Sequence, residues 1–123
     1  MTMFPGSDSV FLIDGPVGQI EAVTSVPKAG DATDVAVICH PHSQMGGSLH
    51  NKVVHTIARA HRDFQHLAVR FNFRGVGKSA GDYASGIGEV DDLDYVVDWS
   101  RKRCPIGRLF LAGFSFGAFV AAK

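Results

Sequence analysis

A serine near the carboxyl end of the chain has the neighbours of a nucleophile. Residues 113–117 read G-F-S-F-G, with Ser115 at the centre and Gly113 and Gly117 at the ends of a G-x-S-x-G pattern. The pattern directly follows the apolar run R-L-F-L-A at 108–112. A sharp turn from a buried strand into a helix presents a serine hydroxyl in this way, and flanking glycines keep strand and helix from clashing with it. The sequence therefore predicts Ser115 as the nucleophile of an acyl transfer.

The same turn would stabilise negative charge on a substrate oxygen. The backbone N–H of Phe116 follows the serine directly and would lie at a helix N-terminus, which favours an anion. A second donor is expected from the loop H-P-H-S-Q-M-G-G-S at 40–48, which follows another apolar run. Within it, the backbone N–H of His42 is the first choice and that of Ser43 the second. Together these groups predict an oxyanion hole.

Several short apolar segments are typical of β-strands. Three are continuous and rich in apolar residues, which suits parallel strands buried on both faces; they span residues 35–39, 67–71 and 108–112. Before them, residues 10–13 and the alternating segment 19–26 flank the turn-rich sequence D-G-P-V-G. This order predicts a mostly parallel sheet with an antiparallel hairpin at its N-terminal end.

Two segments between these strands have the periodicity of helices. The first is predicted from a Ser48 cap to about Arg62. The second is predicted from about Ile87 to Arg103, with acidic residues in its first half, basic residues in its last turn and Pro105 after it. Its buried face is expected to hold residues 87, 90, 93, 97 and 100. The acidic cluster 89–94 is expected to face solvent.

Composition and charge fit one α/β domain over residues 1–123, built as a three-layer sandwich. Twelve basic and twelve acidic side chains cancel, which gives no electrostatic reason to expect nucleic acid or a membrane surface as a partner. The first residues have no basic region followed by an apolar run, so no leader peptide is expected, and no apolar stretch approaches the length of a membrane span, about 20 residues. Cys39 and Cys104 are expected to be reduced, packed thiols. A cytoplasmic location is the resulting expectation.

Three loops, taken in order, resemble one superfamily. The sequences V-I-C-H-P-H-S-Q-M-G-G, R-F-N-F-R-G-V-G-K-S-A-G and L-A-G-F-S-F-G-A-F are similar to the loops after the third, fourth and fifth strands of α/β hydrolases. The likeness is to small bacterial serine hydrolases related to esterases and dienelactone hydrolase, and it covers the chain from about residue 10. It implies hydrolysis of a small ester by Ser115, with Phe116 and His42 as oxyanion donors and without metal or organic cofactor.

The resemblance also assigns the neighbouring loops. It implies that His40 lies in the oxyanion loop and that Arg74 and Gly75 help to build the floor of the site. Asn72 stands where many members of the superfamily have an aspartate two residues before the arginine. This departure is expected to affect loop packing more than the mechanism.

A serine nucleophile needs a base and a carboxylate that orients the base. In the superfamily both follow the serine in chain order, on loops after later strands. They are therefore expected beyond Lys123, in a missing C-terminal half, and the chain alone is expected to show little turnover. Strand 108–112 would expose an apolar edge, so that half or self-association should cover it. His40 and His42 are less favoured as a substitute base, because their orientation would serve the loop.

Three other interpretations follow from the residues. The sequence from Gly75 to Ser79 resembles the end of a phosphate-binding P-loop, which would indicate a nucleotide-phosphate-binding protein, but position 72 is asparagine where that motif needs glycine. His40 and His42 have a spacing used in metal sites, but no third ligand is marked, and no metal site is expected. A non-catalytic module that keeps the hydrolase fold for binding is the third. The motifs do not specify which acyl compound would be the substrate.

Overall fold

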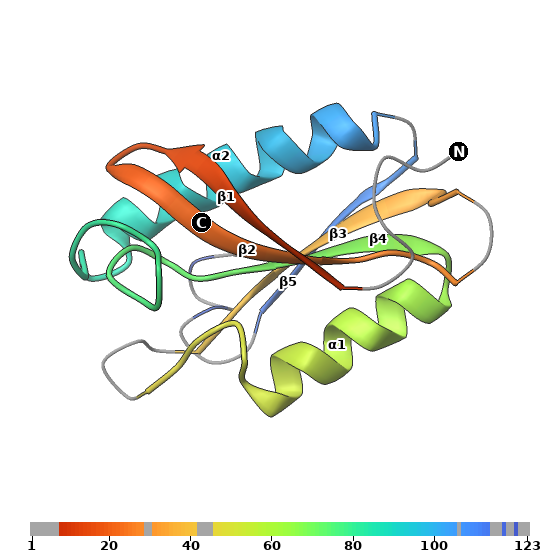
Figure 1. The fold of residues 1–123 in the computed structure, drawn as a ribbon, viewed down its shortest axis with the longest axis horizontal. Helices are drawn as coiled ribbons and strands as arrows, with labels where there is room; N and C mark the ends of the chain where they lie inside the picture. Colours follow the sequence, from red (N-terminus) through yellow and green to blue (C-terminus); the bar gives the residue numbers. More distant parts are fainter. Residues whose placement is uncertain are drawn as a thin grey trace.

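The chain folds around a five-stranded sheet with helices on its two faces (Figure 1). The computed structural model describes residues 8–28, 31–41, 46–105, 107–113, 117 and 120. The strand order is β1-β2-β4-β3-β5. β1 (Ser9–Gly15) and β2 (Gly18–Ser25) form the predicted antiparallel hairpin, and β2 also pairs antiparallel with β4. The parallel strands are β3 (Asp34–Cys39), β4 (His66–Phe71) and β5 (Leu109–Gly113). The predicted three-layer α/β architecture is confirmed.

The parallel strands β3 and β4 are buried on both faces, as their continuous apolar sequences predict. One face packs in a cluster with Leu93 and Val96 of the second helix. The other face carries Ala36, Ile38 and Ala68 and packs against Val54 and Ala58 of the first helix. Cys39 and Cys104 are both reduced, buried thiols, as predicted, and burial raises the pKa of Cys39 to about 12. The core thus holds the sheet rigidly beneath the loops that follow its strands.

Helix α1 (Lys52–Asp63) begins later than predicted. Its N-cap is Asn51, whose side-chain oxygen accepts hydrogen bonds from the backbone N–H groups of Val53 and Val54 at 2.9 and 3.2 Å. The Ser48 hydroxyl instead accepts from the N–H of His50, in the turn before the helix. The predicted Ser48 cap is wrong because both residue types can cap a helix, and periodicity alone does not choose between them.

Helix α2 (Ile87–Arg103) has the predicted bounds but a different buried face. Ile87 is 81% exposed, whereas the carboxylates of Glu89 and Asp92 are fully buried. The prediction that the acidic cluster 89–94 faces solvent is therefore wrong for these two residues. Each has hydrogen-bond partners in the preceding loop, which removes most of the cost of burying a charge. Among the described residues, neither helix is both long and apolar enough to cross a bilayer.

Strand β5 lies at an end of the described sheet and pairs with β3 alone among the described strands. It runs from Leu109 to Gly113, one residue later at each end than predicted. Leu111 in its middle is 44% exposed. The strand therefore carries apolar side chains that the described part of the chain covers only in part.

Candidate active site

The segments predicted to do chemistry all leave the sheet at one edge. Because β3, β4 and β5 are parallel, their carboxyl ends meet there, and the register pairs Cys39 of β3 with Gly113 of β5 (Figure 1). The chain continues from these ends into the loop at 40–48, the loop at 72–81 and the G-x-S-x-G segment. The predicted nucleophile and oxyanion donors lie outside the described residues, and their roles stay predictions: Ser115, Phe116, His42 and Ser43.

The two glycines that flank the predicted serine both lie against the end of β3. Gly113 is the register partner of Cys39. At Gly117 a Cβ atom would overlap the carbonyl oxygen of Cys39 and come within 2.5 Å of the carbonyl oxygen of His40. Only glycine fits at such a distance from another backbone. Three residues later Val120 is fully buried in the core. The chain therefore leaves β5 and returns to the end of β3 within four residues.

His40 is a neutral link between two loops. It is fully buried; its Nδ1–H donates to the carbonyl of Pro41 at 2.6 Å, and its Nε2 accepts from the backbone N–H of Phe73 at 3.0 Å. Burial lowers the pKa of His40, against the smaller opposing effects of the Pro41 carbonyl and the Glu89 charge. Both ring nitrogens are thus occupied by backbone groups, and neither is free to take a proton from a serine. This geometry argues against His40 as the base.

Arg74 joins the loop after β4 to helix α2. Its Nε and one terminal nitrogen donate to the two carboxylate oxygens of Asp92 at 3.1 and 3.0 Å, and its backbone N–H donates to the same carboxylate at 3.0 Å. The same terminal nitrogen reaches the carbonyl of Gly88 at 2.7 Å. The hydrogen-bonded carboxylate raises the pKa of Arg74. Arg74 therefore fixes the loop beneath the predicted site through contacts within the protein.

The loop that resembles a P-loop is bound to β2. The Ser79 hydroxyl donates to the carbonyl of Asn72 at 2.6 Å and accepts from the N–H of Glu21 at 2.8 Å. The N–H of Lys78 donates to the Glu21 carboxylate at 2.9 Å. Gly75, with φ +78°, provides the left-handed turn at the start of the loop. A phosphate would compete with a carboxylate for these donors, so the geometry argues against the nucleotide-binding alternative.

Comparison with known proteins shows which solved structures the fold resembles. No family model matches the chain. An α/β serine hydrolase homologue from Coxiella burnetii is 47% identical, with a TM-score of 0.92 over 98% of this chain and 58% of that one. An α/β serine hydrolase without lid from Xanthomonas campestris is 46% identical, with a TM-score of 0.89 over 98% of this chain and 56% of that one. Over the part that it covers, this chain has the fold of an α/β hydrolase.

The match covers only part of these relatives. An uncharacterised protein of Rickettsia prowazekii is 37% identical over 111 residues, which are 89% of this chain and 46% of that protein. The chain therefore spans about half the length of the α/β hydrolases it matches.

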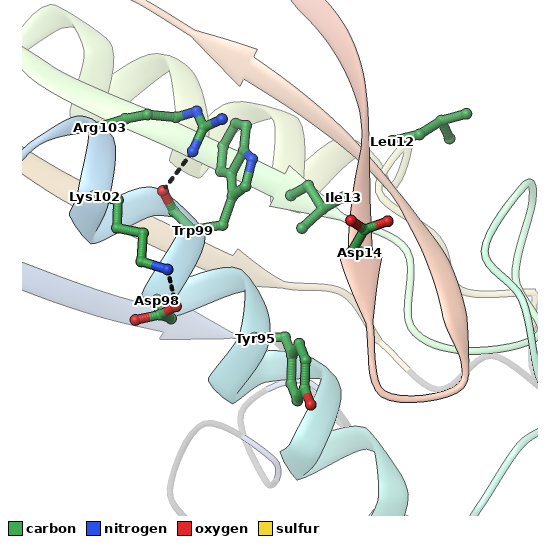
Figure 2. Close-up of a pocket in the computed structure, with 8 residues that line it drawn as sticks. All are labelled: Leu12, Ile13, Asp14, Tyr95, Asp98, Trp99, Lys102 and Arg103. Carbon is green, nitrogen blue, oxygen red and sulfur yellow. Dashed lines mark hydrogen bonds and ion pairs between the residues drawn. The ribbon is translucent and has the colours of Figure 1, made fainter.

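The described part of the chain also has a groove that contains none of the predicted site residues. It has a volume of about 490 Å³ and lies between β1 and the C-terminal part of α2. Figure 2 shows Tyr95 and Trp99 facing β1, the Arg103 guanidinium lying over the Trp99 ring, and Lys102 paired with Asp98. The groove's own cationic groups already have partners. We therefore assign the candidate site to the strand ends and not to this groove.

The histidines outside the site loops include one pair in contact. The Nδ1 atoms of His61 on α1 and His66 on β4 lie 2.8 Å apart, and Nε2 of His66 lies 3.5 Å from the carboxylate of Asp34. This pair lies at the start of the parallel strands, opposite the edge that carries the predicted site. Over the described part of the chain, no three His, Cys, Asp or Glu side chains gather in a possible metal site.

Sequence reasoning missed the roles of two site-supporting residues, Glu89 and Glu21, and it assigned Asn72 to loop packing without identifying its partners. Glu89 accepts from the N–H groups of Ala84 and Gly86 and so closes the turn before α2. Its position three residues after Gly86 gives only half of a capping box, because glycine has no side chain to complete the motif, so the usual sequence signature is absent. Glu21 and Asn72 hydrogen-bond to each other across 51 positions of sequence, and no local pattern marks such a contact.

Proposed function

We propose that this α/β-hydrolase chain forms the nucleophile half of a serine hydrolase that acts on a small ester or related acyl compound. Ser115 would lose its proton to a base while its Oγ bonds to the acyl carbon, and the alcohol would leave with that proton. Water would then release the acid and restore the serine. The observation that carries the proposal is the contact of both flanking glycines, Gly113 and Gly117, with the end of β3.

The oxyanion that forms in each step needs backbone donors. We assign them to the N–H of Phe116 and to an N–H of the oxyanion loop, defined here as residues 40–49, from His42 or Ser43. Two observations support this choice. Gly117 packs on the backbone of Cys39 and His40, so the residues after the serine begin next to this loop. The relatives at 47% and 46% identity are α/β serine hydrolases, or a homologue of them.

The acid and the base of the triad are proposed to come from polypeptide that corresponds to the second half of those relatives. The match covers 58% and 56% of these two relatives, and this supports the proposal because the rest of each relative has no counterpart in the chain. The same polypeptide is proposed to cover the apolar edge of β5, where Leu111 is 44% exposed. A second copy of the chain is the alternative cover.

The proposal is tested by covalent labelling of the full-length protein with a fluorophosphonate, which reacts only with an activated serine. Labelling is expected on the peptide that contains Ser115 and is expected to disappear in Ser115→Ala. Ser85→Ala is the matched control, because Ser85 is exposed and lies in the turn before α2. Absence of labelling, or labelling that survives Ser115→Ala, would favour the non-catalytic binding module.

A further inference from the structure

The oxyanion loop is held at both ends by the same short stretch of the chain. At its start, the His40 ring accepts from the N–H of Phe73 at 3.0 Å. At its end, the N–H of Leu49 donates to Oδ1 of Asn72 at 2.8 Å, and the Leu49 carbonyl accepts from Arg70 at 3.3 Å. These partners are the last residues of β4 and the two that follow. The end of β4 therefore determines where both ends of the loop lie.

The contact between Asn72 and Leu49 depends on which way the Asn72 side-chain amide is turned. Its Nδ2 donates to Oε1 of Glu21 at 2.8 Å, and the same oxygen accepts from the N–H of Lys78 at 2.9 Å. Asn72 is buried, so its side chain has no water to satisfy a wrong orientation. With the amide reversed, an NH₂ group would face the N–H of Leu49 and an oxygen would face the Glu21 carboxylate. Glu21 thus selects the rotamer that lets Asn72 bind Leu49.

Gly77 leaves the space in which this pair forms. A Cβ atom there would lie 2.5 Å from Oε1 of Glu21 and 2.6 Å from Nδ2 of Asn72. The φ of Gly77 is +53°, which also favours glycine. The sequence N-F-R-G-V-G-K-S is therefore explained by contacts to β2, to α2 and to the oxyanion loop.

We propose that Asn72, oriented by Glu21, is a positioning residue that fixes the oxyanion loop for catalysis. The inference rests on the proposed function for its effect on the reaction and on the Leu49 contact for its effect on the loop. Asn72 touches no reacting atom in this account. It acts through Leu49, at the end of the segment that carries the proposed His42 or Ser43 donor. A displaced donor weakens binding of the oxyanion more than binding of the substrate, so the effect is expected on kcat and not on KM.

The pair of Asn72 and Glu21 can be tested by exchanging the amide and the carboxylate between the two positions. Asn72→Asp places a second carboxylate, at a buried position, against the partly buried Glu21, and the two acids repel. We expect kcat for p-nitrophenyl acetate to fall about 10- to 100-fold, with KM changed by about twofold or less. In Asn72→Asp combined with Glu21→Gln, the new amide donates to the new carboxylate. This double variant is expected to recover most of the lost kcat, which a simple loss of packing would not do.

The experiment uses the full-length protein and reads both activity and structure. Steady-state hydrolysis gives kcat and KM, and hydrogen exchange followed by NMR gives the protection of the Leu49 amide. Asn51→Asp is the matched control: it makes the same chemical change two residues from Leu49, at a helix N-cap where a carboxylate is as good an acceptor as an amide. We expect it to leave kcat and the Leu49 protection unchanged.

The two readouts separate failure of the inference from failure of the proposed function. The inference predicts that Leu49 protection falls about tenfold in Asn72→Asp and returns in the double variant. Unchanged Leu49 protection in Asn72→Asp, or a double variant no better than the single one, would overturn it. A wild-type protein that neither hydrolyses esters nor labels at Ser115 would overturn the proposed function, and the exchange measurement would still decide whether Asn72 holds the loop.

Discussion

At the scale of single residues, His40 shows an imidazole used for its two hydrogen-bonding edges. Its Nδ1–H binds the next carbonyl in the chain, and its Nε2 binds the N–H of Phe73 in the neighbouring loop. Protonation of Nε2 would remove the acceptor and place a donor opposite a donor. The burial that lowers the pKa of His40 therefore also keeps the two loops joined at neutral pH.

This arrangement predicts a pH dependence for His40. Because its pKa in the folded state is below the ordinary value of 6.5, its contribution to stability is fully present above pH 6.5. That contribution decreases as the pH falls below 6.5 and is lost once the pH passes through the folded pKa. An NMR titration of the His40 ring is expected to give a midpoint below 6.5. A midpoint at or above 6.5 would contradict the buried, doubly bonded imidazole described here.

At the scale of elements, an ion pair joins helix α2 to the loop after β4, in addition to apolar packing. The Arg74 guanidinium binds the fully buried Asp92 carboxylate with two parallel hydrogen bonds, and the Arg74 side chain is 11% exposed. A buried pair of this kind is expensive to break, since removing one partner leaves the other charge uncompensated. On helix α2, the Asp92 carboxylate is therefore buried and paired with Arg74, at a position that the sequence predicted to face solvent.

Asp92→Ala is expected to lower the free energy of unfolding by about 3–5 kcal/mol, because it leaves the Arg74 guanidinium without its partner. The measurement is urea unfolding of the full-length protein, and the slope of the unfolding free energy against urea concentration is compared between variants. Asp91→Ala is the control on the neighbouring, exposed position, where a change of about 0.5 kcal/mol or less is expected. Equal losses in the two variants would contradict the assigned role of Asp92.

The elements show which parts of the structure the sequence can predict. Continuous apolar runs mark β3 and β4 because both of their faces are covered. The start of α1 was predicted wrongly because Ser48 and Asn51 are both capping residues. The buried face of α2 was predicted wrongly because the buried Asp92 carboxylate pairs with Arg74, which lies 18 positions away in the preceding loop. Local patterns predict elements, whereas contacts of distant polar side chains decide how these elements are turned.

At the scale of the whole molecule, the described sheet ends at β5 with a partly exposed apolar strand. β5 pairs with β3 on one side, and Leu111 is 44% exposed. A free strand edge with apolar side chains pairs readily with another chain. The chain matches α/β hydrolases over about half of their length, and we propose that the rest of a full-length protein supplies this cover.

The 123-residue chain produced alone is expected to associate as its concentration rises, because no described strand pairs with the outer edge of β5. Light scattering over a concentration series measures this. Leu111→Lys places a charge on the strand and is expected to shift the distribution toward the monomer. Val53→Lys on the outer side of α1, where Val53 is 41% exposed, is the control that should leave association unchanged. A monomer at all concentrations would contradict the expectation.

The central claim is that Ser115 is a nucleophile beside an oxyanion hole built from the ends of β3 and β5. A crystal structure of the full-length protein after reaction with a fluorophosphonate tests it most directly. We expect a phosphorus–Oγ bond at Ser115, with the phosphonyl oxygen within about 3 Å of the backbone nitrogens of Phe116 and of His42 or Ser43. Phosphorus on another residue, or an oxygen with no backbone N–H within that distance, would contradict it.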